Sequence, residues 1–172
     1  WNFLARTFLQ LSEYLAITVS SEIYVVSNQL KLYYDTKYQI HTCLEKYPIV
    51  RSRGVRVKTI RQKYGLRKNG YILFVGRFVP EKRLEWLINA SEAFPRYPIV
   101  LTGGSSHSDH YTALIHSLAA GKNIIFTGYI FGKEKEELLS NCRLFVLPSS
   151  LEGFPISVTE ALSYGKLCLV GD

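Results

Sequence analysis

The sequence predicts an α/β fold in which a Rossmann-like parallel sheet carries helices on both faces, preceded by a remnant of a second α/β domain. From residue 71 onward, short runs of Ile, Leu, Val and Phe alternate with segments of helical spacing. The runs lack polar alternation and each ends at Gly or Pro, as expected of strands buried on both faces of a parallel sheet. We expect strands over residues 71–76, 97–103, 123–128, 143–148 and 166–171.

Helices are expected between these strands, which makes each connection a right-handed crossover. Pro80 suits a first helical turn, and the apolar stripe Leu84, Leu87, Ile88, Ala90 continues that helix toward Phe94. The other three helices are expected over residues 111–118, 133–141 and 156–164, with Gly121 and Gly165 as stop signals after the first and last.

The first 70 residues predict a smaller unit. Apolar residues spaced by three and four from Trp1 to Leu15 indicate an amphipathic helix, which packs on its own domain or lies on a membrane. A strand over 22–26 and a helix over 28–38, capped by Ser27 or Asn28, would follow. One βα unit cannot bury its own sheet, so we interpret residues 1–53 as the end of an amino-terminal domain plus a linker around 47–57, and residues 54–172 as the second domain.

Composition excludes several classes of protein. The 172 residues are 47% apolar and 20% charged, which is ordinary for a globular chain. The longest apolar run, 71–75, is far shorter than the roughly 20 residues of a transmembrane helix. Three scattered cysteines form neither a metal motif nor a disulfide framework, which favours a reducing, cytoplasmic compartment. The sequence lacks Met, and we expect it to be a fragment.

Positive charge is concentrated in one segment. The net charge is +7, yet residues 71–172 carry 9 Lys and Arg against 10 Asp and Glu. Residues 46–68 hold nine cations and no carboxylate. Such a segment attracts nucleic acid, an anionic membrane or a phosphorylated ligand, or is a solvated linker.

Glycines and charged residues follow the predicted strands where ligands bind to open parallel sheets. They lie at residues 76–77, 103–105, 128–130 and 149–155. A single glycine at a strand end is ordinary turn chemistry, but four such positions at one edge indicate a binding site. The histidines His107 and His110 have a short metal-like spacing without a third ligand, so we interpret them as loop or cap residues.

Two charged pairs stand out at this edge. Arg77 and Lys82 flank the start of a helix, where backbone amides favour anions, so they suit a phosphate; alternatively they are surface cations that pair with Glu81 or Glu85. Glu152 and Glu160 are eight positions apart, at most roughly 12 Å along a helix. The two carboxylates can bind hydroxyl groups at opposite ends of an elongated ligand. Alternatively, Glu152 is a polar loop or cap residue and Glu160 is a solvated carboxylate on a helix.

The backbone between the two glutamates suits an anion. Gly153 permits a close backbone approach, and the amides of Ile156 and Ser157 can donate to a phosphate, whereas Pro155 contributes only shape.

These motifs resemble the retaining nucleotide-sugar glycosyltransferases of family 4, which have the GT-B architecture. The resemblance rests on residues 74–83, 126–130 and 147–165, and the last of these contains the E-x7-E signature of that family. It implies that residues 54–172 are the carboxyl-terminal, nucleotide-sugar-binding domain, truncated at its end. The connector reads Arg-Ser-Arg-Gly where the family has Pro-Asn-Gly, and most of the amino-terminal domain is absent, so we expect donor binding without appreciable turnover.

The resemblance assigns roles at the site. Arg77, Lys82 and Glu152 become catalytic: the cations bind the donor diphosphate and Glu152 contacts the transferred sugar. Glu160 binds the ribose and Ile130 approaches the base. The substrate-binding candidates are Gly76, Gly104, Tyr129, Ile130, Gly153, Phe154, Pro155, Ile156, Ser157 and Glu160.

The implied reaction needs no cofactor and no metal. The donor is a UDP- or GDP-sugar, the acceptor is a glycan or a lipid-linked glycan, and the pathway makes a cell-surface polysaccharide or glycolipid. The protein is expected to be cytoplasmic, and contact with the inner face of the membrane is compatible with it. The alternatives are a GT-B nucleotide-sugar epimerase and a basic membrane-surface or nucleic-acid module. We expect no nucleic-acid partner, because the cations lack interleaved aromatic residues and no known motif appears.

Overall fold

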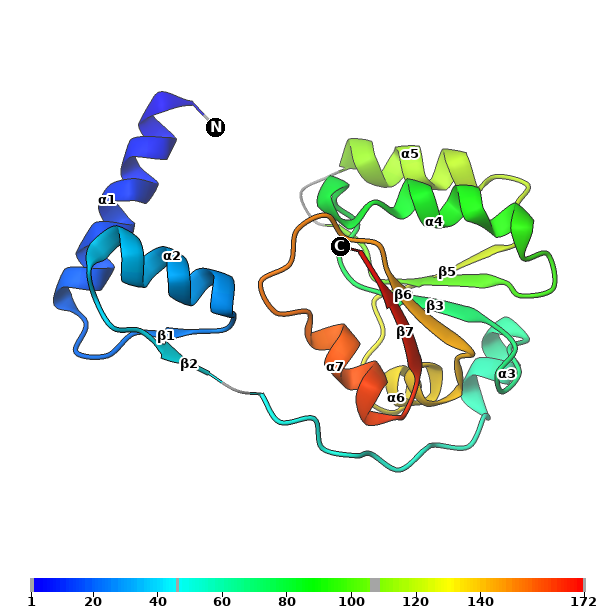
Figure 1. Cartoon of the computed structure of the whole chain (residues 1–172). Coiled ribbons are helices and arrows are strands. Elements are labelled where there is room, and N and C mark those ends of the chain that lie inside the picture. The colour runs from blue at the N-terminus through cyan, green and yellow to red at the C-terminus, as the bar shows by residue number, and fades with distance from the viewer. Residues whose placement is uncertain (1, 46, 106–108, 172) are drawn as a thin grey trace. The chain divides into compact units, whose positions relative to one another are not determined.

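The computed structural model describes residues 2–45, 47–105 and 109–171, and it divides the chain into two compact units, 1–48 and 49–172 (Figure 1). Predictions that involve Trp1, Lys46 and His107 fall outside the described residues. Each unit is described by itself below.

The first unit contains helix α1 (Phe3–Val19), strand β1 (Tyr24–Val25), helix α2 (Asn28–Tyr38) and strand β2 (Cys43–Leu44). Ser27 caps α2 by accepting a hydrogen bond from the Leu30 amide at 3.2 Å, as the sequence predicts. The strands pair in parallel. We did not predict β2, which is only two residues long and is held by Asp35 of α2, whose carboxylate accepts from the Thr42 amide at 2.8 Å.

The second unit is built on five parallel strands in the order β5-β4-β3-β6-β7. Helices α4 and α5 cover one face of this sheet, and α3, α6 and α7 lie on the other (Figure 1). The predicted α/β class and Rossmann-like sheet are therefore confirmed. The strands are β3 (Ile72–Val75), β4 (Ile99–Thr102), β5 (Ile124–Gly128), β6 (Leu144–Leu147) and β7 (Leu167–Val170). The helices are α3 (Thr59–Tyr64), α4 (Leu84–Ala90), α5 (Asp109–Ala119), α6 (Gly132–Asn141) and α7 (Ile156–Ser163).

Burial follows the position of each strand in the sheet. All four residues of the inner strand β4 are buried, as its unbroken apolar run predicts. The expectation of burial on both faces is wrong for β7, where Leu167 and Leu169 are exposed. Side chains two positions apart point to the same face of a strand, so Leu167 and Leu169 share one face of this edge strand, and no described element buries them there.

The helix predicted from Pro80 is interrupted. Residues Pro80–Lys82 form a short 3-10 turn, and Arg83 then takes a left-handed conformation with φ 51°. Helix α4 therefore begins only at Leu84, whose amide donates to the Tyr111 hydroxyl of α5 at 3.1 Å. A side chain from a neighbouring helix thus replaces the missing local cap.

The connector, which we define as residues 49–58, has no regular secondary structure but is bound to the second unit. The Ser52 amide donates to the Ser163 carbonyl at 2.9 Å, and the Asn141 side chain donates to the Val55 carbonyl at 2.8 Å. These bonds explain why the units divide at Pro48/Ile49 rather than at 53/54, where we placed the boundary.

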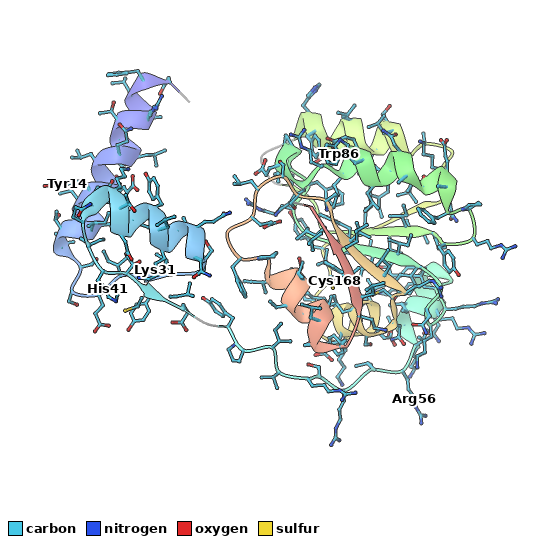
Figure 2. All side chains as sticks on the ribbon, viewed as in Figure 1. Tyr14, Lys31, His41, Arg56, Trp86 and Cys168 are labelled. Carbon is cyan, nitrogen blue, oxygen red and sulfur yellow. The ribbon has the colours of Figure 1, made fainter. Side chains whose placement is uncertain are left out.

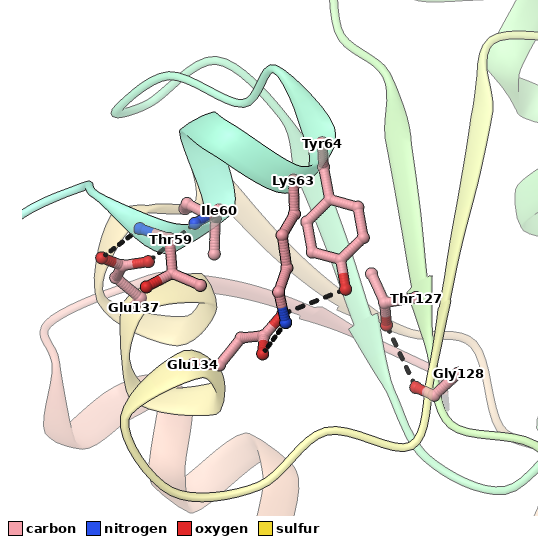
Figure 3. A network of polar contacts seen from close by, with 8 residues as sticks. All are labelled: Thr59, Ile60, Lys63, Tyr64, Thr127, Gly128, Glu134 and Glu137. Carbon is pink, nitrogen blue, oxygen red and sulfur yellow. Dashed lines mark hydrogen bonds and ion pairs between the residues drawn. The ribbon is translucent and has the colours of Figure 1, made fainter.

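Helix α3 follows the connector and was not predicted from the sequence. The buried carboxylate of Glu137 on α6 accepts hydrogen bonds from the amides of Lys58, Thr59 and Ile60 at 2.6, 3.0 and 2.8 Å. Figure 3 shows the bonds from Thr59 and Ile60. A distant glutamate therefore caps this six-residue helix, and Gly65 ends it with φ 67°.

Within the described ranges, no helix is both long and apolar enough to cross a membrane.

Candidate functional site

The carboxyl ends of the five parallel strands lie at one edge of the sheet, and the loops that leave them run side by side. The Phe78 amide donates to the Gly104 carbonyl at 2.9 Å, and the Gly103 amide donates to the Gly128 carbonyl at 2.9 Å. The segments after β3, β4 and β5 are therefore tied together. We call the surface formed by residues 76–82, 103–105, 128–131 and 148–157 the carboxyl edge.

Glycines allow the backbones to approach at this edge. Gly103 has φ 127°, and a Cβ atom there would lie 1.9 Å from the Gly76 carbonyl oxygen. A Cβ atom on Gly104 would lie 3.0 Å from the Tyr129 ring. Gly76, Gly104 and Tyr129, three of the predicted binding residues, are thus brought together by the packing of three loops.

Lys82 and Glu152 meet directly although 70 residues separate them. The loop after β6 is held to the 3-10 turn because the Ser150 amide donates to the Glu81 carbonyl at 2.9 Å. This places the Glu152 carboxylate in an ion pair with the Lys82 ammonium, whose side chain is only 13% exposed. The predicted alternative for Lys82, a pair with Glu81 or Glu85, is not what the structure shows. Glu85 instead faces Arg83, at 3.9 Å.

Arg77 is exposed on the segment that leaves β3, five residues before Lys82. In the described part of the chain, no hydrogen bond or ion pair involves its guanidinium. Its charge is therefore available to an anionic ligand at the carboxyl edge.

Helix α7 begins directly after this loop and directs unused amides toward the edge. Pro155 occupies its N-cap position, and none of the side chains that the structure describes caps the helix. The amides of Ile156 and Ser157 lie in the first turn, where no earlier helical carbonyl can accept from them. Phe154 and Gly153 precede this turn, half-buried and exposed respectively. The first turn of α7 thus has two backbone donors four and five residues beyond Glu152.

Glu160 has a different partner. Its carboxylate pairs with the Lys135 ammonium of α6 at 2.6 Å. Both residues line a hollow of about 380 Å³ together with Phe131, the residue after Ile130. We expected the two glutamates to bracket one ligand, and the structure gives each of them its own cation.

Sequence reasoning missed two residues of this region. Lys135 lies in the first turn of α6, and the Gly-Lys-Glu-Lys start of that helix was its only signal. Ser149, in the loop before Glu152, is buried, and its hydroxyl has no hydrogen-bond partner within the residues that the structure describes. No local pattern in the sequence marks it.

No group of three or more His, Cys, Asp or Glu side chains that could hold a metal ion occurs among the described residues.

Comparison with known proteins reveals matches along most of the chain. Residues 56–172 match the family described as "Glycosyl transferases group 1". The O-antigen chain mannosyltransferase C of Escherichia coli is 33% identical over 153 residues, which are 87% of this chain and 40% of the relative. The O-antigen chain mannosyltransferase B of the same organism is 32% identical over 112 residues, which are 62% of this chain and 29% of the relative.

The fold also matches solved structures. The crystal structure of Anabaena HepE in complex with UDP and glucose superposes with a TM-score of 0.78 at 20% identity, over 94% of this chain and 47% of that one. The chain thus spans less than half the length of each of these proteins.

Proposed function

This chain belongs to the glycosyl transferases group 1 family, and we propose that it is the donor-binding part of a retaining hexosyltransferase in polysaccharide or glycolipid biosynthesis. The donor would be a UDP- or GDP-sugar, and the acceptor a glycan or lipid-linked glycan. Two mannosyltransferases of O-antigen chains among its relatives support this pathway and substrate class.

The observation that carries the proposal is the contact of Lys82 with Glu152 at the carboxyl edge, where the exposed Arg77 leaves β3 and the first turn of α7 begins. A donor diphosphate placed there would take the Lys82 ammonium from Glu152, which frees the carboxylate to accept from a sugar hydroxyl. Glu160 would bind the ribose in the hollow beside Phe131. Ile130 would approach the base.

The proposed transfer breaks the bond between the anomeric carbon and the diphosphate oxygen. The acceptor oxygen bonds to the same face of the anomeric carbon, and its proton passes to the departing phosphate. Arg77 and Lys82 stabilise the negative charge that develops on the leaving group, because preorganised cations lower the barrier where charge appears.

We place this reaction on the cytoplasmic side of a membrane. The cysteine pattern supports this placement, because it shows no disulfide framework. A lipid-linked acceptor would require the protein to approach the membrane surface.

Nucleotide binding tests the proposal in the 172-residue chain. Thermal unfolding is followed with UDP, GDP, ADP and their sugars; a diphosphate at about 100 times its dissociation constant stabilises the fold by roughly 2.7 kcal/mol. Arg77→Ala should weaken binding about 10- to 100-fold, because a charged hydrogen bond contributes about 1.5–3 kcal/mol. Arg96→Ala removes an exposed cation that precedes β4, at the opposite edge, and should leave binding unchanged. Absence of stabilisation by every nucleotide, or equal effects of both variants, would contradict the proposal.

A further inference from the structure

The segment 49–68, which we call the connector surface, is fixed to the second unit by its backbone. The connector donates to and accepts from α6 and α7 through Ser52 and Val55. Glu137 holds the amides that open α3 (Figure 3). Because the backbone faces the protein, its charged side chains point outward; Arg56, for example, extends away from the fold (Figure 2).

This surface carries unpaired positive charge. Seven of its exposed cations form no ion pair within the described part of the chain: Arg51, Arg53, Arg56, Lys58, Arg61, Arg67 and Lys68. The eighth cation, Lys63, is paired with Glu134 at 2.7 Å. The carboxylate of Glu137 is buried and accepts hydrogen bonds from backbone amides, so in the described part of the chain it forms no ion pair with the surface cations.

Two of these cations share one hollow. Arg56 and Lys68 line a cavity of about 440 Å³ together with the connector backbone and Asn141. The Asn141 amide nitrogen already donates to the carbonyls of Val55 and Glu137, both at 2.8 Å. Arg56 and Lys68 are therefore the charged residues that border this hollow, and a guanidinium and an ammonium group that reach into solvent suit a phosphate group outside it.

Arg56 and Lys68, the two cations that border the hollow, lie at the opposite edge of the sheet from the Lys82–Glu152 pair. The Asn69 amide, directly after Lys68, donates to the Asn141 carbonyl at 2.8 Å, and the Arg143 amide donates to the Tyr71 carbonyl at 2.9 Å. These residues precede β3 and β6, so they mark the amino ends of the strands. An anion held here would not belong to the donor site at the carboxyl edge.

Exposed aliphatic residues stand next to the cations. Ile49 is 51% exposed and Val50 is 71% exposed, and Arg51 follows them directly. Aliphatic side chains gain free energy in the interfacial region of a bilayer, where cations also meet anionic headgroups. Single-stranded nucleic acid would instead be bound by aromatic side chains that stack on bases.

We propose that the connector surface binds the phosphate headgroups of anionic membrane lipids, with Arg56 and Lys68 as its central cations. This inference rests on the proposed membrane location of the transferase. The inference identifies the connector surface as the part of the protein that would contact the membrane. The carboxyl edge stays free for the donor while the opposite edge holds the lipid.

Vesicle binding by the full 172-residue chain tests the inference. Flotation is measured with vesicles of phosphatidylcholine alone and with vesicles that contain about 30% phosphatidylglycerol. We expect binding only to the anionic vesicles and a steep loss at high salt. The double variant Arg56→Gln/Lys68→Gln should bind them about 30-fold more weakly, since each cation near such a surface strengthens binding roughly fivefold.

The matched control is Arg96→Gln/Lys133→Gln, which removes one exposed Arg and one exposed Lys outside the connector surface. Equal loss in both double variants would overturn the proposal, as would binding that ignores lipid charge. Tighter binding to a single-stranded oligonucleotide than to the vesicles would assign the surface to nucleic acid instead. Thermal stabilisation by nucleoside diphosphates is recorded for every variant, so that a failed donor site is distinguished from a failed lipid surface.

Discussion

Removal of the Glu137 carboxylate should unfold the start of α3 and weaken the whole second unit. The Ile60 amide is buried, so in Glu137→Ala it loses a charged hydrogen bond of about 1.5–3 kcal/mol with no water to replace it. The amides of Lys58 and Thr59 are partly exposed and can bind water, so each adds only a few tenths of a kcal/mol to the loss of unfolding free energy. We expect the free energy of unfolding to fall by about 3 kcal/mol.

Urea denaturation followed by circular dichroism measures this change, and thermal unfolding gives a second value. The second unit spans residues 49–172, or 124 residues, so its unfolding entropy is about 0.26 kcal/mol per degree. A loss of 3 kcal/mol then lowers Tm by roughly 11 °C. Glu137→Gln can place its single amide oxygen on the buried Ile60 amide, which keeps that hydrogen bond without its charge, and loses the weaker bonds to Lys58 and Thr59, so we expect about half the loss.

The matched control is Glu136→Ala, which removes an exposed carboxylate from the adjacent position of the same helix. It should change the free energy of unfolding by less than about 0.5 kcal/mol. If both alanine variants lost the same stability, the capping role of Glu137 would be refuted, and with it the reason given for the existence of α3.

Two further predictions concern a glycine and an ion pair. Gly103→Ala should lower the free energy of unfolding by roughly 3 kcal/mol and abolish nucleotide binding, because the added Cβ would lie 1.9 Å from the Gly76 carbonyl oxygen. Its control is Gly165→Ala, where φ is 67° but the space around the added Cβ is open, so we expect a loss of about 1 kcal/mol. Equal denaturation midpoints for the two glycine variants would contradict this. The hydrogen bond from Lys63 holds the pKa of Glu134 below its ordinary value of 4.5, so its stabilising effect is present above pH 4.5 and disappears as the pH falls through the lowered pKa. Glu134→Gln should therefore flatten the fall in unfolding free energy below pH 4.5 in urea titrations, and a pH profile identical to that of the unaltered chain would exclude this contribution.

Elements whose residues carry a local pattern could be predicted from the sequence. The five strands of the second unit were predicted because apolar runs that end at Gly or Pro suit buried parallel strands. Ser27 and Gly165 mark helix ends by side-chain chemistry and by a positive φ, which depend only on near neighbours. The positions of the charged candidates after these strands followed from the same patterns.

Which charged groups pair with one another depends on how the chain folds. Lys82 contacts Glu152, and Lys135 contacts Glu160, because sheet order and loop path bring together residues that lie 70 and 25 positions apart. Helix α3 exists because a glutamate 77 residues beyond Ile60 binds its first amides. Local patterns encode burial and turns, whereas a hydrogen bond or ion pair between distant segments depends on coordinates that no short stretch of sequence contains.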